Sequence, residues 1–351
     1  MILKLIILSF LTYIECFMMT NLKIINGKLK TIEKEINIEE TIINKRSIKD
    51  NKIKLTSLFN SMKNEILEEK KTIAVIGPTG NLGREVVNKL LKKNVKIKIL
   101  NRHKNLSKII NNFKSKSNIE LVEGDITDIT SLTKLLIDCD VCLTLHGSNR
   151  ITRLTDFLKG GLNDKSHPMY VNYIGMKNLA EAALITKKCK HIIRISGNNE
   201  NPWSILSVLI NLIGSMTKAW NYGGDYELRN SNLKYTIIKP GLMTKEKENT
   251  TIDIVDSSNV NNKNIKVSYD TISDICIECI DNENVINSTI SVKKGDEKKN
   301  IKSLLNNIKR DNIYFENKYR MIGKHYIATI SFVITILMLD LGIFNTILKL
   351  L

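Results

Sequence analysis

The sequence has little proline, few aromatic residues and a deficit of acidic residues. Its 351 residues include 4 prolines and 6% aromatics, and 36 Asp and Glu stand against 53 Lys and Arg, for a formal net charge of +17. A basic balance suggests a nucleic-acid ligand, but the lysines are scattered among asparagines and isoleucines and form no stripe interleaved with aromatics. Compositional bias explains this charge, and nucleic acid is an unlikely partner.

Cysteine is also sparse, and its spacing excludes two classes of site. Two CxxC pairs occur, Cys139/Cys142 and Cys276/Cys279. The first pair straddles a predicted strand, where side chains three residues apart face opposite ways, and the second lies on a predicted amphipathic helix. We expect buried structural thiols, no metal site and no disulfide framework. A G-x-S-x-G elbow, typical of α/β-hydrolases, is missing too.

The first 70 residues have the features of a targeting region. Residues 1–18 combine one early lysine with an apolar run, as in a signal peptide. Residues 19–70 are rich in Lys and Asn and show no strong period, which predicts a targeting leader or a disordered segment. A signal followed by a basic leader is the layout for entering the secretory pathway and reaching a plastid-type organelle such as the apicoplast. Acidic residues in the leader keep an endomembrane or secreted protein open as the alternative.

The other end of the chain is polar and then apolar. Residues 294–324 are predicted to be a polar linker and residues 325–351 a hydrophobic helix. The apolar run Tyr326–Leu339 is short for a membrane span, and extending it places Asp340 inside. Two interpretations stay open: a membrane anchor, or a helix packed on the core or on a partner.

Between these ends, residues 71–293 alternate strand-like and helix-like patterns. Such alternation predicts βαβ units and a doubly wound parallel sheet of about seven strands, the α/β Rossmann architecture. The predicted strands are Thr72–Ile76, Val95–Leu100, Ile119–Val122, Val141–Leu145, His191–Ile195, Tyr235–Lys239 and Thr289–Val292. The predicted helices are Leu82–Lys93, Leu106–Phe113, Ile129–Ile137, Met169–Thr186, Ser215–Asn230 and Ile272–Ile280. The charged, Asn-rich stretch Lys245–Lys266 is predicted to be a loop or a reduced substrate lobe.

The most informative motif follows the first predicted strand. Gly77, Gly80 and Gly83 stand at a G-x-x-G-x-x-G spacing, directly before a helical pattern. Glycines let the backbone turn sharply and approach a pyrophosphate, and the helix directs its free N–H groups at that anion. The motif therefore predicts a dinucleotide site.

The end of the second predicted strand carries Asn101 and Arg102. A carboxylate at this place would favour the free ribose hydroxyl of NAD, whereas a guanidinium can bind the 2′-phosphate of NADP. Arg102 thus favours NADP as the cofactor, with NAD less expected. A solvated surface arginine is the alternative.

Seven blocks together resemble one family. In chain order they are GPTGNLG, LNRH, VEGDITD, DVCLTLHGS, VNYIGMKNLAEAA, HIIRISG and YTIIKPG. They are similar to the atypical short-chain dehydrogenase/reductases of the NmrA-like NAD(P)-binding group, over about Lys71 to Val292. The resemblance implies a Rossmann fold with NADP along Gly77, Thr79, Gly80, Asn81, Leu82, Arg102, Asp125 and Ile126. It also implies a nicotinamide near Gly147, Ser196 and Pro240, with Tyr173 at its ribose.

Catalytic residues are harder to assign. Short-chain dehydrogenases use a tyrosine with a lysine one helical turn later, a spacing found at Tyr173 and Lys177. These two residues precede the fifth predicted strand, whereas the catalytic pair should follow it. After that strand, the candidates are Ser196, Tyr222 and Lys218, although the expected Tyr-xxx-Lys order is missing. His146 is taken as a cofactor contact or a solvated group rather than an acid or base.

Two functions are therefore predicted. One is an NADP-linked oxidoreductase acting on a small-molecule substrate. The other is a non-catalytic NADP-binding scaffold, sensor or assembly factor with a protein partner, which the imperfect catalytic motif favours.

Overall fold

The computed structural model describes residues 70–102, 118–153, 156, 164–246, 251–256, 266–295, 300–312 and 314–340. They belong to one compact unit, Lys70–Leu351. The predicted signal peptide, nearly all of the predicted leader and the predicted helix Leu106–Phe113 lie outside the described residues.

An eight-stranded sheet forms the centre of this unit, in the order β3-β2-β1-β4-β5-β6-β10-β8. Its parallel strands are β1 (Thr72–Ile76), β2 (Lys96–Asn101), β3 (Ile119–Glu123), β4 (Val141–Thr144), β5 (His191–Ile195), β6 (Lys234–Pro240) and β10 (Ser288–Lys294). The seven predicted strands and the doubly wound arrangement are confirmed. The sheet reads clearly from sequence because parallel strands buried on both faces are continuous apolar runs, such as TIAVI in β1.

The stretch Lys245–Lys266 differs from its prediction as a loop. It contains β8 (Ile252–Asp256), which pairs antiparallel with β10 at the sheet edge, and it ends at β9 (Lys266–Ser268), which pairs with β7 (Leu242–Thr244). In β8 the buried Ile252 and Ile254 alternate with more exposed residues. Alternation over five residues is a weak signal inside a charged, Asn-rich segment, which is why the edge strand was missed.

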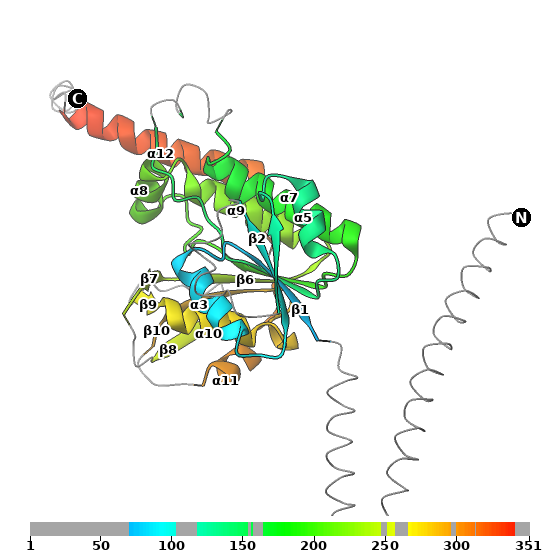
Figure 1. Cartoon of the computed structure of the whole chain (residues 1–351). Coiled ribbons are helices and arrows are strands. Elements are labelled where there is room, and N and C mark those ends of the chain that lie inside the picture. Colours follow the sequence, from blue (N-terminus) through cyan, green and yellow to red (C-terminus); the bar gives the residue numbers. More distant parts are fainter. Residues whose placement is uncertain are drawn as a thin grey trace, which may run out of the picture. The chain divides into compact units, whose positions relative to one another are not determined.

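Helices cover both faces of the sheet (Figure 1). On one face lie α3 (Asn81–Leu90), α10 (Tyr269–Glu278) and α11 (Ile301–Asn306), and on the other α5 (Ile129–Leu136), α7 (Gly175–Thr186) and α9 (Thr217–Arg229). Alternate residues of β1 serve the two cores: Ile73 and Val75 pack in one, and Ala74 and Ile76 in the other. The described cysteines are buried in these cores, as predicted.

The predicted helix Met169–Thr186 begins as a π-helix, η1 (Met169–Ile174), before α7 continues it. Helix α9 lies against η1 so closely that a methyl group at Gly224 would fall 2.0 Å from the backbone oxygen of Asn172. At Gly223 it would fall 3.1 Å from the Tyr173 ring. Two glycines within a helix normally weaken it, but here they allow this close helix packing.

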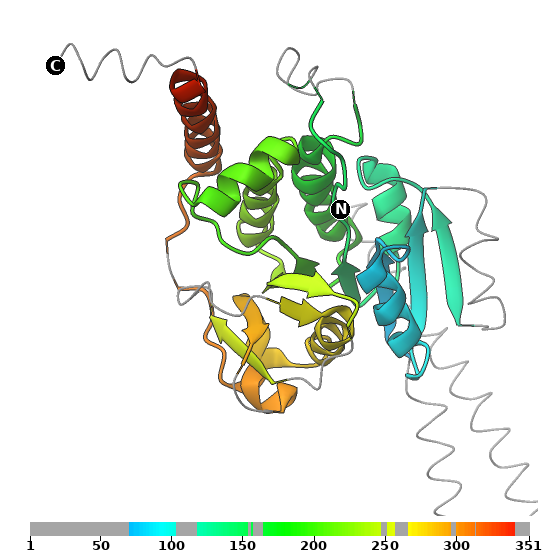
Figure 2. The ribbon, with the colours of Figure 1, turned by 90° about the vertical axis from the view of Figure 1, so that its left-hand side faces the viewer.

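Two apolar helices complete the described fold. Helix α8 (Ile205–Ile213) was not predicted, and α12 (Lys318–Asp340) begins earlier than the predicted residue 325. Helix α11 lies within the predicted linker. Helix α12 packs on α8 and α9, and its far end then projects from the body of the domain (Figures 1 and 2). Residues Lys318–Leu339 are long and apolar enough to cross a membrane by length and composition, with 17% of the most apolar window buried.

Candidate functional site

A cavity of about 320 Å³ opens at the carboxyl ends of the central strands. It is lined by Ile76, Gly77, Pro78, Thr79, Leu100, Asn101, Arg102, Asp125, Ile126, His146, Gly147, Ser148, Asn149, Arg150, Ser166 and Val171. Strand order reverses here, because β1 is followed on one side by β2 and on the other by β4. Open α/β sheets bind ligands at such switch points.

The three glycines of the motif differ in whether the fold leaves room for a side chain at their position. Gly77 has φ +82°, and a methyl group on it would lie 2.8 Å from the backbone nitrogen of His146. A methyl group on Gly83 would lie 2.1 Å from the backbone oxygen of Gly77. At Gly80 the nearest protein atom would be 3.7 Å away, which is ordinary contact. Gly77 and Gly83 are therefore required by the fold, whereas Gly80 leaves space for a ligand.

The N-terminus of α3 is suited to binding an anion. Its N-cap is Gly80, no side chain caps it, and no acidic residue stands in its first turn. The first N–H groups of a helix need acceptors and carry its positive dipole end. The backbone at Gly77–Gly80 and the start of α3 therefore fit a pyrophosphate.

Arg102 and Asp125 stand together at the end of the cavity formed by β2 and β3. The Arg102 side chain is 62% exposed, and its Nε lies 3.9 Å from Asp125 Oδ2. Asp125 Oδ1 accepts hydrogen bonds from the backbone nitrogen and the hydroxyl of Thr127, both at 2.8 Å. These bonds fix the Asp125 carboxylate, while the guanidinium keeps most of its surface open to a ligand.

His146 is held as a neutral ring. Its Nε2 lies 3.1 Å from the Val171 backbone oxygen, and its Nδ1 lies 2.7 Å from the Thr144 hydroxyl. Since a carbonyl only accepts, Nε2 donates and Nδ1 accepts. Burial, with the nearby Arg194 charge, lowers the pKa of His146 to about 3. This histidine shapes the cavity wall and is unsuited to acid–base work near neutral pH.

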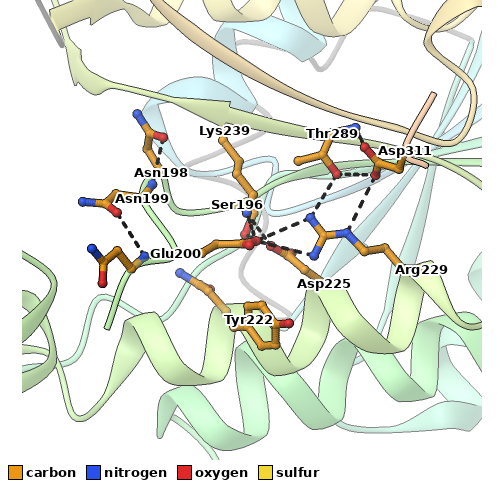
Figure 3. A network of polar contacts seen from close by, with 12 residues as sticks. Ser196, Asn198, Asn199, Glu200, Tyr222, Asp225, Arg229, Lys239, Thr289 and Asp311 are labelled. Atoms are coloured by element: carbon orange, nitrogen blue, oxygen red, sulfur yellow. Dashed lines mark hydrogen bonds and ion pairs between the residues drawn. The ribbon is translucent and has the colours of Figure 1, made fainter. Parts of the chain in front are cut away.

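A buried polar network lies farther along the sheet, where β5, β6 and α9 meet (Figure 3). Asp225, which is 1% exposed, is its centre. Its Oδ2 accepts a hydrogen bond from the Ser196 hydroxyl at 2.7 Å and lies 3.5 Å from Lys239 Nζ. Its Oδ1 lies 2.8 Å from Arg194 Nε. The Ser196 hydroxyl is thus committed to a carboxylate.

The network extends through Glu200 and Arg229 to the chain after β10. Glu200 pairs with Lys239 and accepts from Arg229 Nη2 at 3.4 Å. Burial alone raises the pKa of Glu200, but Lys239 and Arg229 outweigh it and lower the pKa to about 2. Arg229 Nη2 also donates to Thr289 Oγ1 at 3.0 Å, and Thr289 donates to Asp311 at 2.6 Å. The charges therefore tie α9 to the C-terminal segment.

The other two predicted catalytic residues stand one helical turn apart on α9. The hydroxyl of Tyr222 donates to the Glu316 backbone oxygen at 2.6 Å, and burial raises the pKa of this phenol. Lys218 is buried, and a methyl group built at Gly197 would lie 3.4 Å from its Nζ. Burial and the charge of Lys239 lower the pKa of Lys218 to about 8. Tyr222 thus faces the C-terminal segment, while Lys218 lies against the loop after β5.

Most predicted cofactor residues lie together. Gly77, Thr79, Arg102, Asp125, Ile126 and Gly147 line the cavity, and Gly80, Asn81, Leu82 and Gly83 follow directly at the start of α3. Tyr173 and Pro240 stand outside the cavity lining. Tyr173 stacks on Trp220 with ring centroids 6.0 Å apart, and Pro240 ends β6.

Sequence reasoning missed two groups of polar residues. One is the loop after β4, where the buried Arg150 pairs with Asp156 and, at 3.1 Å, with Asp164. The other is the Asp225 network. Its sequence signal was a charged residue next to the last position of a largely apolar strand, as in Arg194 and Lys239.

The sheet order, the glycine turn and the switch-point cavity define a Rossmann protein built for a dinucleotide. A model of the NAD(P)H-binding family matches residues 77–283, more than half of the chain. The chain belongs to this NAD(P)H-binding family, and the predicted likeness to atypical short-chain dehydrogenase/reductases is confirmed. It is an NAD(P)-binding, oxidoreductase-like protein.

Solved structures agree on the fold. The oxidoreductase ylbE from Lactococcus lactis is 21% identical with a TM-score of 0.50, covering 67% of this chain and 94% of that one. A short-chain dehydrogenase/reductase from Veillonella parvula in complex with NADP is 15% identical with a TM-score of 0.52, covering 64% and 95%. A proposed NAD-dependent epimerase/dehydratase from Bacillus halodurans is 16% identical with a TM-score of 0.54, covering 67% and 98%. No curated protein sequence matches the chain.

Proposed function

We propose that this protein is an NADP-linked oxidoreductase acting on a small-molecule substrate. The observation that carries the NADP preference is the open guanidinium of Arg102 at the ribose end of the cavity, where no carboxylate ends β2. A guanidinium can donate two parallel hydrogen bonds to a phosphate, and its charge rewards the extra phosphate of NADP.

The proposed cofactor contacts follow the cavity. The backbone from Gly77 to Gly80 and the start of α3 would hold the diphosphate, and Asp125 with Ile126 would hold the adenine. When bound, the cofactor supplies hydride transfer. The nicotinamide would lie toward Gly147 and the loop after β5.

Lys218 is the strongest candidate for a proton-transferring group on this chain. Of the three predicted catalytic residues, Ser196 donates to Asp225 and Tyr222 donates to Glu316. The ammonium of Lys218 stands against Gly197, and its pKa of about 8 allows exchange of a proton near neutral pH. We therefore assign Lys218 as the proton donor, with Ser196 and Tyr222 holding the surrounding loop and helix.

The test of cofactor choice is calorimetric titration of NADPH and NADH into Arg102→Asp. We expect NADPH affinity to fall by about 10- to 100-fold, since a charge-assisted bond contributes about 1.5–3 kcal/mol. NADH affinity should hold or improve. Arg320→Asp is the matched control, because Arg320 is a similarly exposed arginine on α12. Unchanged NADPH and NADH affinities in Arg102→Asp would refute the assignment.

A second candidate is a non-catalytic scaffold or sensor that holds the nucleotide and binds a protein. The hydroxyls of Ser196 and Tyr222 favour this candidate, because both donate hydrogen bonds to groups of the protein itself and neither is free to donate to a substrate. A screen of NADPH oxidation with quinones, aldehydes and enones separates the two. Turnover that is lost in Lys218→Met, with NADPH binding retained, supports the enzyme. NADPH binding without turnover on any of these substrates supports the scaffold.

For location, we propose that residues 1–69 direct the protein through the secretory pathway to a plastid-type organelle, as the leader composition suggests. Fusion of residues 1–69 to a fluorescent protein tests this. Accumulation in the endomembrane system or the medium would favour the alternative destination.

A further inference from the structure

Helices α8 and α12 pack together (Figure 1), and both carry several exposed apolar side chains. On α8, Ile205, Leu206 and Ile213 are more than half exposed, and Trp203 just before it is 57% exposed. Single exposed apolar residues are ordinary, but contiguous ones on neighbouring helices mark a binding surface.

Helix α12 has two halves with different surroundings. In the first half, His325 and Ala328 are buried, and His325 Nδ1 lies 3.1 Å from Asn211 Nδ2 on α8. The Tyr326 ring meets Trp220 on α9 edge-on, with centroids 6.3 Å apart. These contacts fix the direction in which the second half, from residue 330 onward, leaves the domain (Figure 2).

The second half of α12 is exposed around its whole circumference and is apolar except for Ser331 and Thr335, whose hydroxyl donates to the Ser331 backbone oxygen at 2.8 Å. None of the residues 330–339 is buried, and the four consecutive residues 334–337 are all exposed. Successive α-helical residues are about 100° apart, so four of them point to every side. A protein groove covers one stripe of a helix, whereas lipid surrounds all of it.

The same two segments lack charge. Residues 203–215 and 326–339 contain no Asp, Glu, Lys or Arg. Attraction to anionic lipid headgroups therefore has no source on this surface, and burial of apolar area is the driving force. The partner that fits is the uncharged, apolar interior of a bilayer.

We propose that α8 and the second half of α12 form one bilayer-binding surface. Residues 330–339 rise about 15 Å along the helix, about half of the ~30 Å hydrocarbon thickness, so they enter one leaflet. This places Asp340 near the inner end of the inserted segment, at a cost of roughly 2.5–3.5 kcal/mol that burial of the apolar residues before it offsets. Helix α8 lies along the interface, with Trp203 at the headgroup level where indoles are enriched. The NAD(P)-binding domain then stands on the membrane through two elements.

Trp203 gives a local test, because Trp203 and Trp220 are the two tryptophans of the chain. The full chain is mixed with phosphatidylcholine vesicles that carry brominated acyl chains, which quench nearby indoles. In Trp220→Phe, emission from Trp203 should fall by roughly half, since an interfacial indole reaches the acyl chains. In Trp203→Phe, emission from the packed Trp220 should be nearly unchanged. Both results should be insensitive to salt.

Paired substitutions test α8 and α12 separately. Ile205→Glu with Leu206→Glu should abolish quenching of Trp203, and Ile334→Glu with Leu337→Glu should reduce it. Leu184→Glu with Ile185→Glu is the matched control: the residues are adjacent and similarly exposed, but lie on α7. Circular dichroism and thermal unfolding verify that each variant is folded.

Three outcomes would overturn the proposal: no quenching in the wild-type chain, equal quenching of both tryptophans, or unchanged quenching of Trp203 in the α8 variant. These measurements need no nucleotide. A negative result would therefore leave the proposed NADP-linked function untouched.

Discussion

Polar groups are arranged in opposite ways in two regions of the sheet, one around β1, β2 and β3 and one around β5 and β6. Around β1, β2 and β3, the start of α3 is uncapped and Arg102 is largely exposed, so donors face a cavity. Around β5 and β6, Asp225 and Arg194 are buried and bound to neighbours. The region around β1, β2 and β3 offers its donors to an external anion, whereas the charged groups around β5 and β6 pair with one another.

The largest expected effect on stability comes from breaking the buried polar network around Asp225. Asp225→Asn removes a buried charge and leaves the cation Arg194 uncompensated, which should lower the free energy of unfolding by about 3–5 kcal/mol. Urea unfolding measures it. Asp281→Asn is the control, since this exposed carboxylate pairs with Lys71 at the surface and its loss should cost less than about 1 kcal/mol. Similar costs for both variants would contradict the assigned role of the network.

In the glycine motif that joins β1 to α3, Gly83→Ala should lower the free energy of unfolding by about 1–3 kcal/mol, because the added methyl group would overlap the backbone of Gly77 and Pro78. Thermal unfolding without nucleotide measures this effect. A variant as stable as the wild type would show that α3 does not need its close contact with the turn.

Lys218 sharpens the comparison, since its burial disfavours the charged form of its side chain. Its pKa is about 8 in the folded state and 10.5 unfolded, so the unfolded chain holds the proton more tightly. The destabilising contribution of Lys218 should therefore fade with rising pH between about 8 and 10.5, which the difference between wild type and Lys218→Met isolates. At pH 7, Lys218→Met should raise the free energy of unfolding by about 3 kcal/mol, and the gain should vanish above pH 10.5.

Urea unfolding across this pH range checks the Lys218 prediction. Lys177→Met, at an exposed position on α7, is the control and should change stability by less than about 0.5 kcal/mol. A Lys218→Met effect that is the same at pH 7 and pH 10.5 would show that the buried ammonium is not its source.

The smallest effect on stability is expected at Gly80. Gly80→Ala meets no atom closer than 3.7 Å, and its φ of −66° suits alanine, so stability should change by less than about 0.5 kcal/mol. NADPH affinity should nevertheless fall by about tenfold or more, because the methyl group enters the space assigned to the diphosphate. Calorimetric titration decides, and unchanged affinity would move the diphosphate away from Gly80.

The sequence alone determined the alternating strands and helices and the glycine turn. Parallel strands such as β1 are apolar on both faces, and Gly77 and Gly83 stand where the backbone allows no side chain. These signals are local, so they can be recognised in the sequence without knowledge of distant contacts.

Only the tertiary structure decided the state of the proposed catalytic residues and the extent of the apolar surface. Ser196 meets Asp225 across 29 positions of sequence, and Tyr222 meets Glu316 across 94. Such pairings depend on how α9 and the C-terminal segment pack, which no local pattern encodes. The same holds for α8, whose apolar run resembles a core helix in sequence but packs beside α12 and leaves Ile205, Leu206 and Ile213 exposed.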